Sequence, residues 1–491
     1  MVGQAFRERQ VLVTVVLAAV PILVVIALLL TRLPAWVPPV AGVATAIVIG
    51  LWVLDAHTAE LTDAVGGSMT TMLKVLAIIG GGVTLARVMD FTGAQQQLAD
   101  WLAAGGASLG SALMMANGVV PFMESVTGFG VSLLIGLPLT LAFGFTAYRA
   151  ALITLMGIVI GPWGSMGPGT LLGAELAGQP LTEFGLATAV VNVPAVIISG
   201  IVTAVIAARH TRVRGAKFFG YLTVGAASGL GLALLVLAAN LLLGTPVAGA
   251  VAAALMTIIW LLIVRKGALR PGPGGSIVPY AVLVFGTIAG QIIASRFAAS
   301  WWTEVIASPA VYAFAGVAVA LWQYGQPATG LAASSFGLWL KTGVPTALYI
   351  LFGVVMEGGH IAETLAQSLA SLGAGYLFLM PVVGALGGYM TASGTGTNAM
   401  FGPTQVAVGV QLDVHPQWSM AMNNAAGCWG TIASPARIEL SYQLSRGASL
   451  RDAGPEVTRG RLLAVTLPVL ALSTLIWGVM VYVMLPGLAP L

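Results

Sequence analysis

Glu124 is the residue in this chain whose type and setting best suit chemistry. It lies in an apolar segment, residues 117–130, which Pro121 and the glycines at 128 and 130 interrupt. A carboxylate in hydrocarbon is energetically costly, so an acid is rarely kept there without a function. Glycine and proline free backbone groups that lipid cannot satisfy, and such backbone survives at membrane depth only where protein or water covers it. The segment therefore indicates a transport site.

Glu124 is predicted to carry a proton, because burial favours the neutral form of a carboxyl group. The alternative is a structural acid that satisfies nearby N–H groups. Hydroxyl and amide side chains near Glu124 and in a second polar segment are candidate substrate ligands, with helix capping as their alternative role. Together with glycines that permit a tight backbone, these candidates are Ser125, Thr127, Gly128, Ser393, Thr395, Gly396, Thr397 and Asn398.

Asn423 and Asn424 are also candidate ligands, because they precede a glycine-rich segment at 425–430. Residues 161–168, which include Trp163 and Ser165, form a similar segment. Both segments are predicted to be unwound parts of helices that line one cavity. The alternative is a glycine-rich packing interface between close helices.

Four further residues have weaker claims. Arg437 could hold a substrate carboxylate, although its arginine neighbours favour a role in topology. His360 could relay protons beside Glu357, although a loop histidine is the simpler interpretation. Lys74 and Lys341 are interpreted as anchors near helix ends.

The composition is that of a membrane protein. Of the 491 residues, 58% are hydrophobic and 7% are charged, whereas a soluble domain has about 25% charged residues. Basic residues cluster in loops, so the net charge of +4 indicates topology and not a nucleic-acid partner. The single cysteine, Cys428, excludes a disulfide framework and a cysteine-ligated zinc site.

These patterns predict an all-α polytopic membrane protein with about twelve transmembrane helices and two re-entrant helical hairpins. The hairpins are predicted at 108–144 and 376–412, where glycine, serine and threonine interrupt apolar segments. The first apolar run is long for a signal peptide and is interpreted as a retained helix. The twelve spans, each near the length that crosses a bilayer, are expected near residues 11–30, 37–54, 68–88, 148–167, 182–207, 221–243, 245–264, 278–295, 309–323, 342–358, 418–436 and 463–486.

Loop charge gives the predicted orientation. The basic loops at 209–217 and 265–270, and the arginines between 437 and 461, are expected to face the cytoplasm. Twelve spans then place both termini outside. Arg7 and Arg9 conflict with that placement, but the three basic segments outnumber them.

The second half of the sequence resembles the first at a nearly constant offset in residue number. The corresponding segments are Leu73-Lys74 with Leu340-Lys341, Ser125-Val126-Thr127-Gly128 with Ser393-Gly394-Thr395-Gly396, and Trp163-Gly164-Ser165 with Trp429-Gly430-Thr431. An odd number of spans separates the copies, so the second copy is expected to be inverted and the two hairpin tips to meet near the midplane. Helix N-termini at those tips would suit an anionic substrate. The predicted units are 1–217 with the first hairpin, a linking helix pair and cytoplasmic loop at 218–275, and 276–491 with the second hairpin.

At these motifs the chain resembles the lactate permease family of bacterial carboxylate transporters. Residues 121–131 are similar to that family's Phe-Glu-Ser-Ile-Thr-Gly-Phe-Gly signature. Residues 393–405 lie where the family has a Ser-Asp-Thr-Ser-Ser-Asn-type motif, and residues 423–435 fall within its next signature. The resemblance implies a secondary transporter in the bacterial inner membrane that imports lactate, glycolate or a similar 2-hydroxy monocarboxylate by proton symport with alternating access. Fold-level analogy also implies scaffold and transport domains, and a homodimer.

The chain departs from the family pattern at two places. Gly394 stands where an Asp is usual, and Ala436 with Arg437 replaces a polar pair. These departures leave the substrate and the coupling ion open. The alternative is a transporter of another organic anion, such as a dicarboxylate or a sugar acid, that is sodium-coupled, or a passive anion channel.

An enzyme is not expected. The sequence contains neither a His-Glu-x-x-His pair nor a Gly-x-Ser-x-Gly elbow, which serve metal-dependent and serine hydrolases. A nucleotide-binding loop is also absent, so ATP-driven pumping is disfavoured. No cofactor or metal is expected. The expected partners are a small organic anion, protons or sodium ions, and the lipid bilayer.

Overall fold

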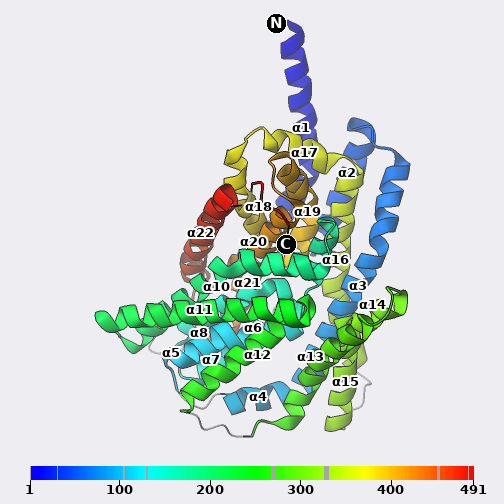
Figure 1. Cartoon of the computed structure of the whole chain (residues 1–491). Helices are drawn as coiled ribbons and strands as arrows, with labels where there is room; N and C mark the ends of the chain where they lie inside the picture. The colour runs from blue at the N-terminus through cyan, green and yellow to red at the C-terminus, as the bar shows by residue number, and fades with distance from the viewer. Residues whose placement is uncertain are drawn as a thin grey trace.

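The structure is a computed structural model that describes residues 2–29, 31, 33–102, 106–128, 131–266, 271–325, 331–449, 454–484 and 486–490. Across these residues the architecture is all-helical, as predicted (Figure 1). Nine of the described helices are long and apolar enough to cross a membrane, or ten when one bent helix pair counts as a single span. The chain is therefore a multi-pass membrane protein.

The first part of the chain forms long helices, three short ones and an interrupted hairpin. Residues 115–119 are π-helical and residues 157–166 form a kinked 3-10 segment. In chain order the α-helices are α1 (Val2–Leu29), α2 (Val37–Val53), α3 (Thr58–Phe91), α4 (Ala94–Leu102), α5 (Leu109–Met114), α6 (Val120–Thr127), α7 (Val131–Ala142), α8 (Ala147–Met156), α9 (Pro168–Leu176) and α10 (Leu181–Thr211).

A tightly joined helix pair, α11 (Ala216–Leu243) and α12 (Thr245–Val264), links this part to the second. A short 3-10 turn at residues 431–433 interrupts the later helices. These are α13 (Gly274–Ala294), α14 (Trp301–Ala307), α15 (Pro309–Tyr324), α16 (Leu331–Gly358), α17 (Ile361–Ala370), α18 (Ala374–Thr391), α19 (Gly394–Gln411), α20 (Pro416–Gly430), α21 (Pro435–Ser449) and α22 (Arg459–Met484).

The order of elements in the first part recurs in the second. The helix α3 ends at Phe91 and α16 ends at Gly358. The offset of the internal repeat pairs these two residues. The short helices α4 and α17 begin at Ala94 and Ile361, which are separated by the same offset. A helical hairpin, a broken helix and a long final helix follow in each part. The inverted relation of the two parts stays a prediction.

Both predicted hairpins have the expected helix–turn–helix form. The first runs through α5, α6 and α7, with its turn after Thr127, and the second is α18 and α19, with its turn at Ala392 and Ser393. In Figure 1, α6 and α7 lie in the lower part of the view, and α18 and α19 lie in the upper part. Whether either hairpin is re-entrant stays a prediction.

Some predicted helix bounds were wrong. Those of the second hairpin, 376–412, agree with α18 and α19, although α18 is itself long and apolar enough to span. The span expected at 418–436 is a helix that ends at Gly430, because the chain turns through residues 431–434 before α21. Lys74 and Lys341 were expected near helix ends, but both lie far inside α3 and α16. The total of twelve spans stays a prediction.

Glycines allow the second hairpin to pack against α20 at very short range. A Cβ atom on Gly388 would lie 1.7 Å from the carbonyl oxygen of Gly427, and one on Gly430 would lie 2.2 Å from the carbonyl oxygen of Ala385. Small residues allow this approach between membrane helices, whose association depends on van der Waals packing. The contact holds α18 beside the helix that carries Cys428.

Replacing Gly388 with Ala should therefore destabilise the protein. The added methyl group meets backbone of α20, which cannot move aside as a side chain can, and overpacking of this kind costs about 1–3 kcal/mol. Thermal unfolding of the purified protein in detergent measures the effect. Gly375→Ala is the matched control on the same helix, because nothing lies within 4 Å of a Cβ atom there. Equal unfolding temperatures for the two variants would contradict the tight contact.

Candidate functional site

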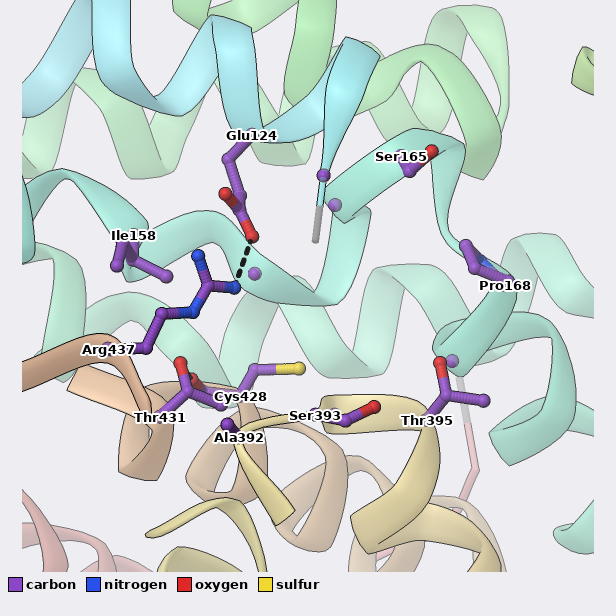
Figure 2. A pocket seen from close by; sticks show the side chains of 15 residues that line it. Glu124, Ile158, Ser165, Pro168, Ala392, Ser393, Thr395, Cys428, Thr431 and Arg437 are labelled. Carbon is purple, nitrogen blue, oxygen red and sulfur yellow. Dashed lines mark hydrogen bonds and ion pairs between the residues drawn. The ribbon is translucent and has the colours of Figure 1, made fainter. Parts of the chain in front are cut away.

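A small cavity, here named the central cavity, lies where the two hairpin turns and two interrupted helices meet (Figure 2). Its volume is about 70 Å³, and a cavity needs about 10–15 Å³ on this measure to hold one water molecule, so this one fits a ligand of a few non-hydrogen atoms. Segments that are far apart in the sequence supply its walls. The lining residues are Glu124, Gly128, Ile158, Gly161, Gly164, Ser165, Pro168, Gly169, Ala392, Ser393, Gly394, Thr395, Cys428, Thr431 and Arg437.

The first hairpin turn depends on Gly128. Its backbone angles, φ 58° and ψ −163°, end α6 in a conformation that side chains disfavour. A Cβ atom on Gly128 would also lie 2.6 Å from the Cβ atom of Ser165. The glycine therefore lets the hairpin turn touch the kinked 3-10 segment. Phe129 and Gly130, which belong to the same predicted motif, lie outside the described residues.

The second hairpin turn caps the start of α19. The Ser393 hydroxyl accepts a hydrogen bond from the Gly396 amide at 3.1 Å, and the Ser393 carbonyl accepts one from the Thr397 amide at 3.0 Å. A helix N-terminus leaves its first amides without an intrahelical partner, and those of Gly394 and Thr395 belong to residues that line the cavity. They place the positive end of an 18-residue helix against it.

The 3-10 segment at 157–166 is unwound, as predicted for this glycine-rich region. Backbone angles leave the helical range at Ile160, Gly164 and Ser165, and φ is positive at Ser165, Met166 and Gly167. The second glycine-rich segment, 425–430, stays α-helical, so the prediction that it is unwound was wrong. The break comes at Thr431–Ser434 instead, where Pro435 starts the next helix.

A buried ion pair joins the first hairpin to α21. Arg437 Nη2 lies 3.1 Å from Glu124 Oε1, and the two side chains are 8% and 5% exposed. The Ser132 hydroxyl, from α7, donates a hydrogen bond to the other carboxylate oxygen. Figure 2 shows the two charged groups pointing toward each other across the cavity wall. The topological role considered for Arg437 was therefore wrong, because this arginine is buried and paired.

Two polar groups on the cavity wall have no hydrogen-bond partner among the described residues. They are Arg437 Nη1 and the hydroxyl of Ser165, both buried. An unsatisfied buried polar group costs about 1–3 kcal/mol, and more when it is charged. A ligand with acceptor oxygens, or water, would satisfy them.

Cys428 and Gly394 fit each other closely on the opposite wall. A Cβ atom on Gly394 would lie 2.3 Å from Cys428 Sγ, so the thiol occupies the space of any larger residue at 394. The sulfur in turn contacts the amide oxygen of Asn424 at 3.8 Å. Gly394 is the position where the resembling family usually has an Asp. The space of that acid is therefore filled by the cysteine.

The predicted asparagines lie behind the cavity, in a buried hydrogen-bond network. Asn398 Nδ2 donates to the Gly169 carbonyl and to Asn424 Oδ1, each at 2.9 Å, and Asn423 Nδ2 donates to Asn398 Oδ1 at 3.0 Å. Asn424 donates in turn to the Thr170 hydroxyl at 3.0 Å. The network ties α19 and α20 to α9. It positions the cavity wall, and none of the three asparagines lines the cavity.

Of the other predicted site residues, Glu124, Gly128, Ser165, Ser393, Thr395 and Arg437 line the cavity, and the rest do not. Ser125 and Thr127 donate to carbonyls of their own helix, and Thr397 donates to the Ser393 carbonyl. Trp163 is fully buried behind the kinked segment. His360 begins α17 and lies 3.2 Å from Glu60 Oε2, outside the cavity. The residues that line no part of the cavity are Ser125, Thr127, Trp163, His360, Gly396, Thr397, Asn398, Asn423 and Asn424.

Sequence reasoning missed Ser132, which binds Glu124 from the next helix, and Thr431, which lines the cavity. The position of Thr431 opposite Ser165 in the internal alignment was a usable signal, whereas Ser132 carries no comparable pattern. Cys428 belongs to the segment 425–430 that was predicted to line a cavity, and it does so. Among the described residues, no group of three or more His, Cys, Asp or Glu residues could hold a metal ion.

The described helices form a multi-pass membrane protein with a small cavity at its interrupted helices. Residues 285–445 match the family model described as L-lactate permease. That match includes the second hairpin and Arg437. The predicted resemblance to the lactate permease family is therefore confirmed.

Named relatives agree with the family model. The chain is 24% identical over 358 residues to an L-lactate permease of Streptococcus iniae, which covers 64% of this chain and 73% of that protein. An L-lactate permease of Bacillus subtilis is 32% identical over 90 residues, or 18% of this chain and 16% of that protein. A glycolate permease of Escherichia coli K12 is 32% identical over 94 residues, or 19% and 17% of the two chains.

Among solved structures, the YdaH transporter of Alcanivorax borkumensis is similar at 19% sequence identity and a TM-score of 0.39. The alignment covers 87% of this chain and 88% of that one. A likeness at this level does not establish a shared fold.

The stability of the ion pair can be tested with a double-mutant cycle. Glu124→Gln and Arg437→Gln each leave one buried charge unpaired, which costs about 3–5 kcal/mol. The double variant removes both charges and should recover much of that loss. Thermal unfolding in detergent gives the four values. Additive losses in the double variant would show that the two side chains do not interact.

A second cycle tests the fit between Gly394 and Cys428. Gly394→Ala should lower the unfolding temperature, because its Cβ atom meets the sulfur. Adding Cys428→Ala should restore stability, since the Cys428 Cβ atom would lie 3.7 Å from the new methyl group, an ordinary contact. Cys428→Ala alone is the control for the lost thiol. If the double variant is no more stable than Gly394→Ala, another contact limits position 394.

Proposed function

We propose that this protein is a secondary active transporter that imports a small monocarboxylate by proton symport with alternating access. The substrate is a 2-hydroxy acid similar to lactate or glycolate. The observation that carries this proposal is the Glu124–Arg437 ion pair in the wall of the central cavity between the two hairpin turns. The family match and the relatives named L-lactate and glycolate permease support the substrate class.

The ion pair provides a direct link between proton and substrate. Arg437 holds the carboxylate of Glu124 when the cavity lacks an anion. A substrate carboxylate competes with Glu124 for the same guanidinium group, which lines the cavity. Protonation of Glu124 removes the competitor, because a neutral acid no longer neutralises the arginine. Proton and anion therefore bind together, and the loaded site gains no net charge.

Other lining groups suit the remainder of a 2-hydroxy acid. The amides of Gly394 and Thr395 lie at the positive end of α19, where an anion is favoured. The hydroxyl groups of Thr395 and Thr431 can exchange hydrogen bonds with a substrate hydroxyl. The small volume disfavours a sugar acid. A cavity of this size also supports a carrier more than an open anion channel.

The two hairpins suit alternating access if they approach the cavity from opposite faces of an inner membrane. In this proposal residues 1–217 and 276–491 are inverted repeats, and residues 218–275 link them with two spans. Retreat of either hairpin turn would open the cavity to one side only. The matching order of elements at the offset of the internal repeat supports this arrangement.

Uptake into proteoliposomes tests the proposal. Purified protein should accumulate L-[14C]lactate against its gradient when the inside is alkaline, and an uncoupler should abolish accumulation. The Glu124→Gln variant should lose proton-driven accumulation by about 100-fold or more, in line with the loss of an essential proton-transfer group. It should keep some lactate exchange, because Arg437 then has no carboxylate competitor.

Two results would overturn this proposal. Accumulation that requires a sodium gradient and ignores the pH gradient would replace the proton with sodium. Accumulation that is unchanged in Glu124→Gln would remove Glu124 from the coupling. A dicarboxylate added in excess is the specificity control, and it should compete poorly because Arg437 is the one cation that lines the cavity in the described part of the chain.

A further inference from the structure

A second, larger cavity adjoins the central one. Its volume is about 270 Å³, and it shares Ala392, Ser393 and Arg437 with the central cavity. The second hairpin turn and one arginine therefore form the wall between the two spaces. The remaining lining residues come mostly from α16 and α21 and the end of α1, and they are Leu29, Ala35, Lys341, Thr342, Pro345, Thr346, Tyr349, Thr391, Ala436 and Leu440.

The face of α16 that lines this cavity carries an unusual lysine. Lys341, Pro345 and Tyr349 recur every four residues, so they lie on one face of the helix. Lys341 lies within α16, ahead of the most apolar part of that helix, and it is exposed where it lines the cavity. In the described part of the chain, no ion pair includes Lys341.

The corresponding lysine of the first repeat behaves differently. Lys74 aligns with Lys341 in the internal repeat, yet its Nζ lies 3.1 Å from Glu304 Oε2. The charge of Lys74 is thus neutralised, whereas Lys341 lines a cavity without acidic residues among its described walls. The two halves therefore differ at these matched positions, because an acid neutralises only the first lysine.

A second polar group in this cavity also lacks a partner. The hydroxyl of Tyr349 is buried, the residue is 6% exposed, and no hydrogen bond satisfies it among the described residues. Arg437 Nη1 at the shared wall is in the same condition. Lys341, Tyr349 and Arg437 all line this cavity and all carry hydrogen-bond donors, and donors of this kind favour an anion.

We propose that the larger cavity is a vestibule that binds the small carboxylate before it passes the Ser393 turn into the central cavity. Lys341 attracts the anion, Tyr349 donates a hydrogen bond to it, and Arg437 receives it at the shared wall. This inference rests on the proposed function, since it assumes that the central cavity receives a small organic anion. It adds a second binding site and a residue, Lys341, that sets the rate of capture.

Equilibrium exchange of L-[14C]lactate in proteoliposomes tests the vestibule. Equal concentrations on both sides make the result independent of how the protein is oriented. At low ionic strength, Lys341→Gln should raise the half-saturating concentration about three- to tenfold, because electrostatic capture speeds association. The difference should shrink at about 0.5 M KCl, where the screening length is a few ångströms. The maximal exchange rate should stay within a factor of about two, since Lys341 lines only the outer space.

Three variants complete the experiment. Lys341→Arg keeps the charge and should match the wild type. The combination Lys74→Gln with Glu304→Gln removes the matched lysine together with its partner, and it should also match the wild type. Tyr349→Phe should raise the half-saturating concentration at both ionic strengths, because a lost hydrogen bond is not screened by salt.

The outcomes separate the vestibule from the proposed function. Suppose that the wild-type protein exchanges lactate, but Lys341→Gln leaves the half-saturating concentration unchanged or raises it equally at both ionic strengths. The vestibule proposal is then wrong, and the proposed transport function is unaffected. A fall in maximal rate with unchanged half-saturation would likewise overturn it. Wild-type protein that exchanges neither lactate nor glycolate would overturn the proposed function and the vestibule with it.

Discussion

The buried ion pair between Glu124 and Arg437 is the constraint on which the site depends. Two charges taken out of water are tolerable only when they face each other and find further hydrogen bonds. Glu124 satisfies this condition through Arg437 and Ser132. The pair therefore fixes α6, α7 and α21 relative to one another. Any event that neutralises the acid, or that brings a competing carboxylate, changes the forces that hold these three elements together.

Around this pair, the backbone is arranged so that interrupted helices can end at one point. Glycines at 128, 394 and 427 allow contacts that a Cβ atom would forbid. The buried asparagine network then holds α9, α19 and α20 in register behind the cavity. The residues that line the central cavity are therefore held in place by neighbours that do not line it. The matched lysines depart from the shared plan of the halves, because Lys74 is paired with Glu304 whereas Lys341 lines the larger cavity.

Much of the architecture could be predicted from the sequence, because hydrophobic runs, glycine interruptions and the repeat offset are local or periodic signals. The bounds of both hairpins and the unwinding at 161–167 were predicted from such signals. The role of Arg437 was not predictable in the same way. Its neighbours in sequence are surface arginines, and only the fold brings it to Glu124, 313 positions away. The mutual hydrogen bonds of the predicted asparagines were not predictable for a related reason. A polar residue in an apolar helix can serve a ligand or another side chain, and the sequence does not distinguish the two.

Cys428 has one more consequence. It is the one thiol in the 491 residues, and it lies in the wall of the central cavity with 4% of its surface exposed. A maleimide or an iodoacetamide that reacts with the native protein has therefore entered that space. The rate of alkylation therefore reports how often the cavity opens to a small reagent, and no engineered residue is needed to measure it.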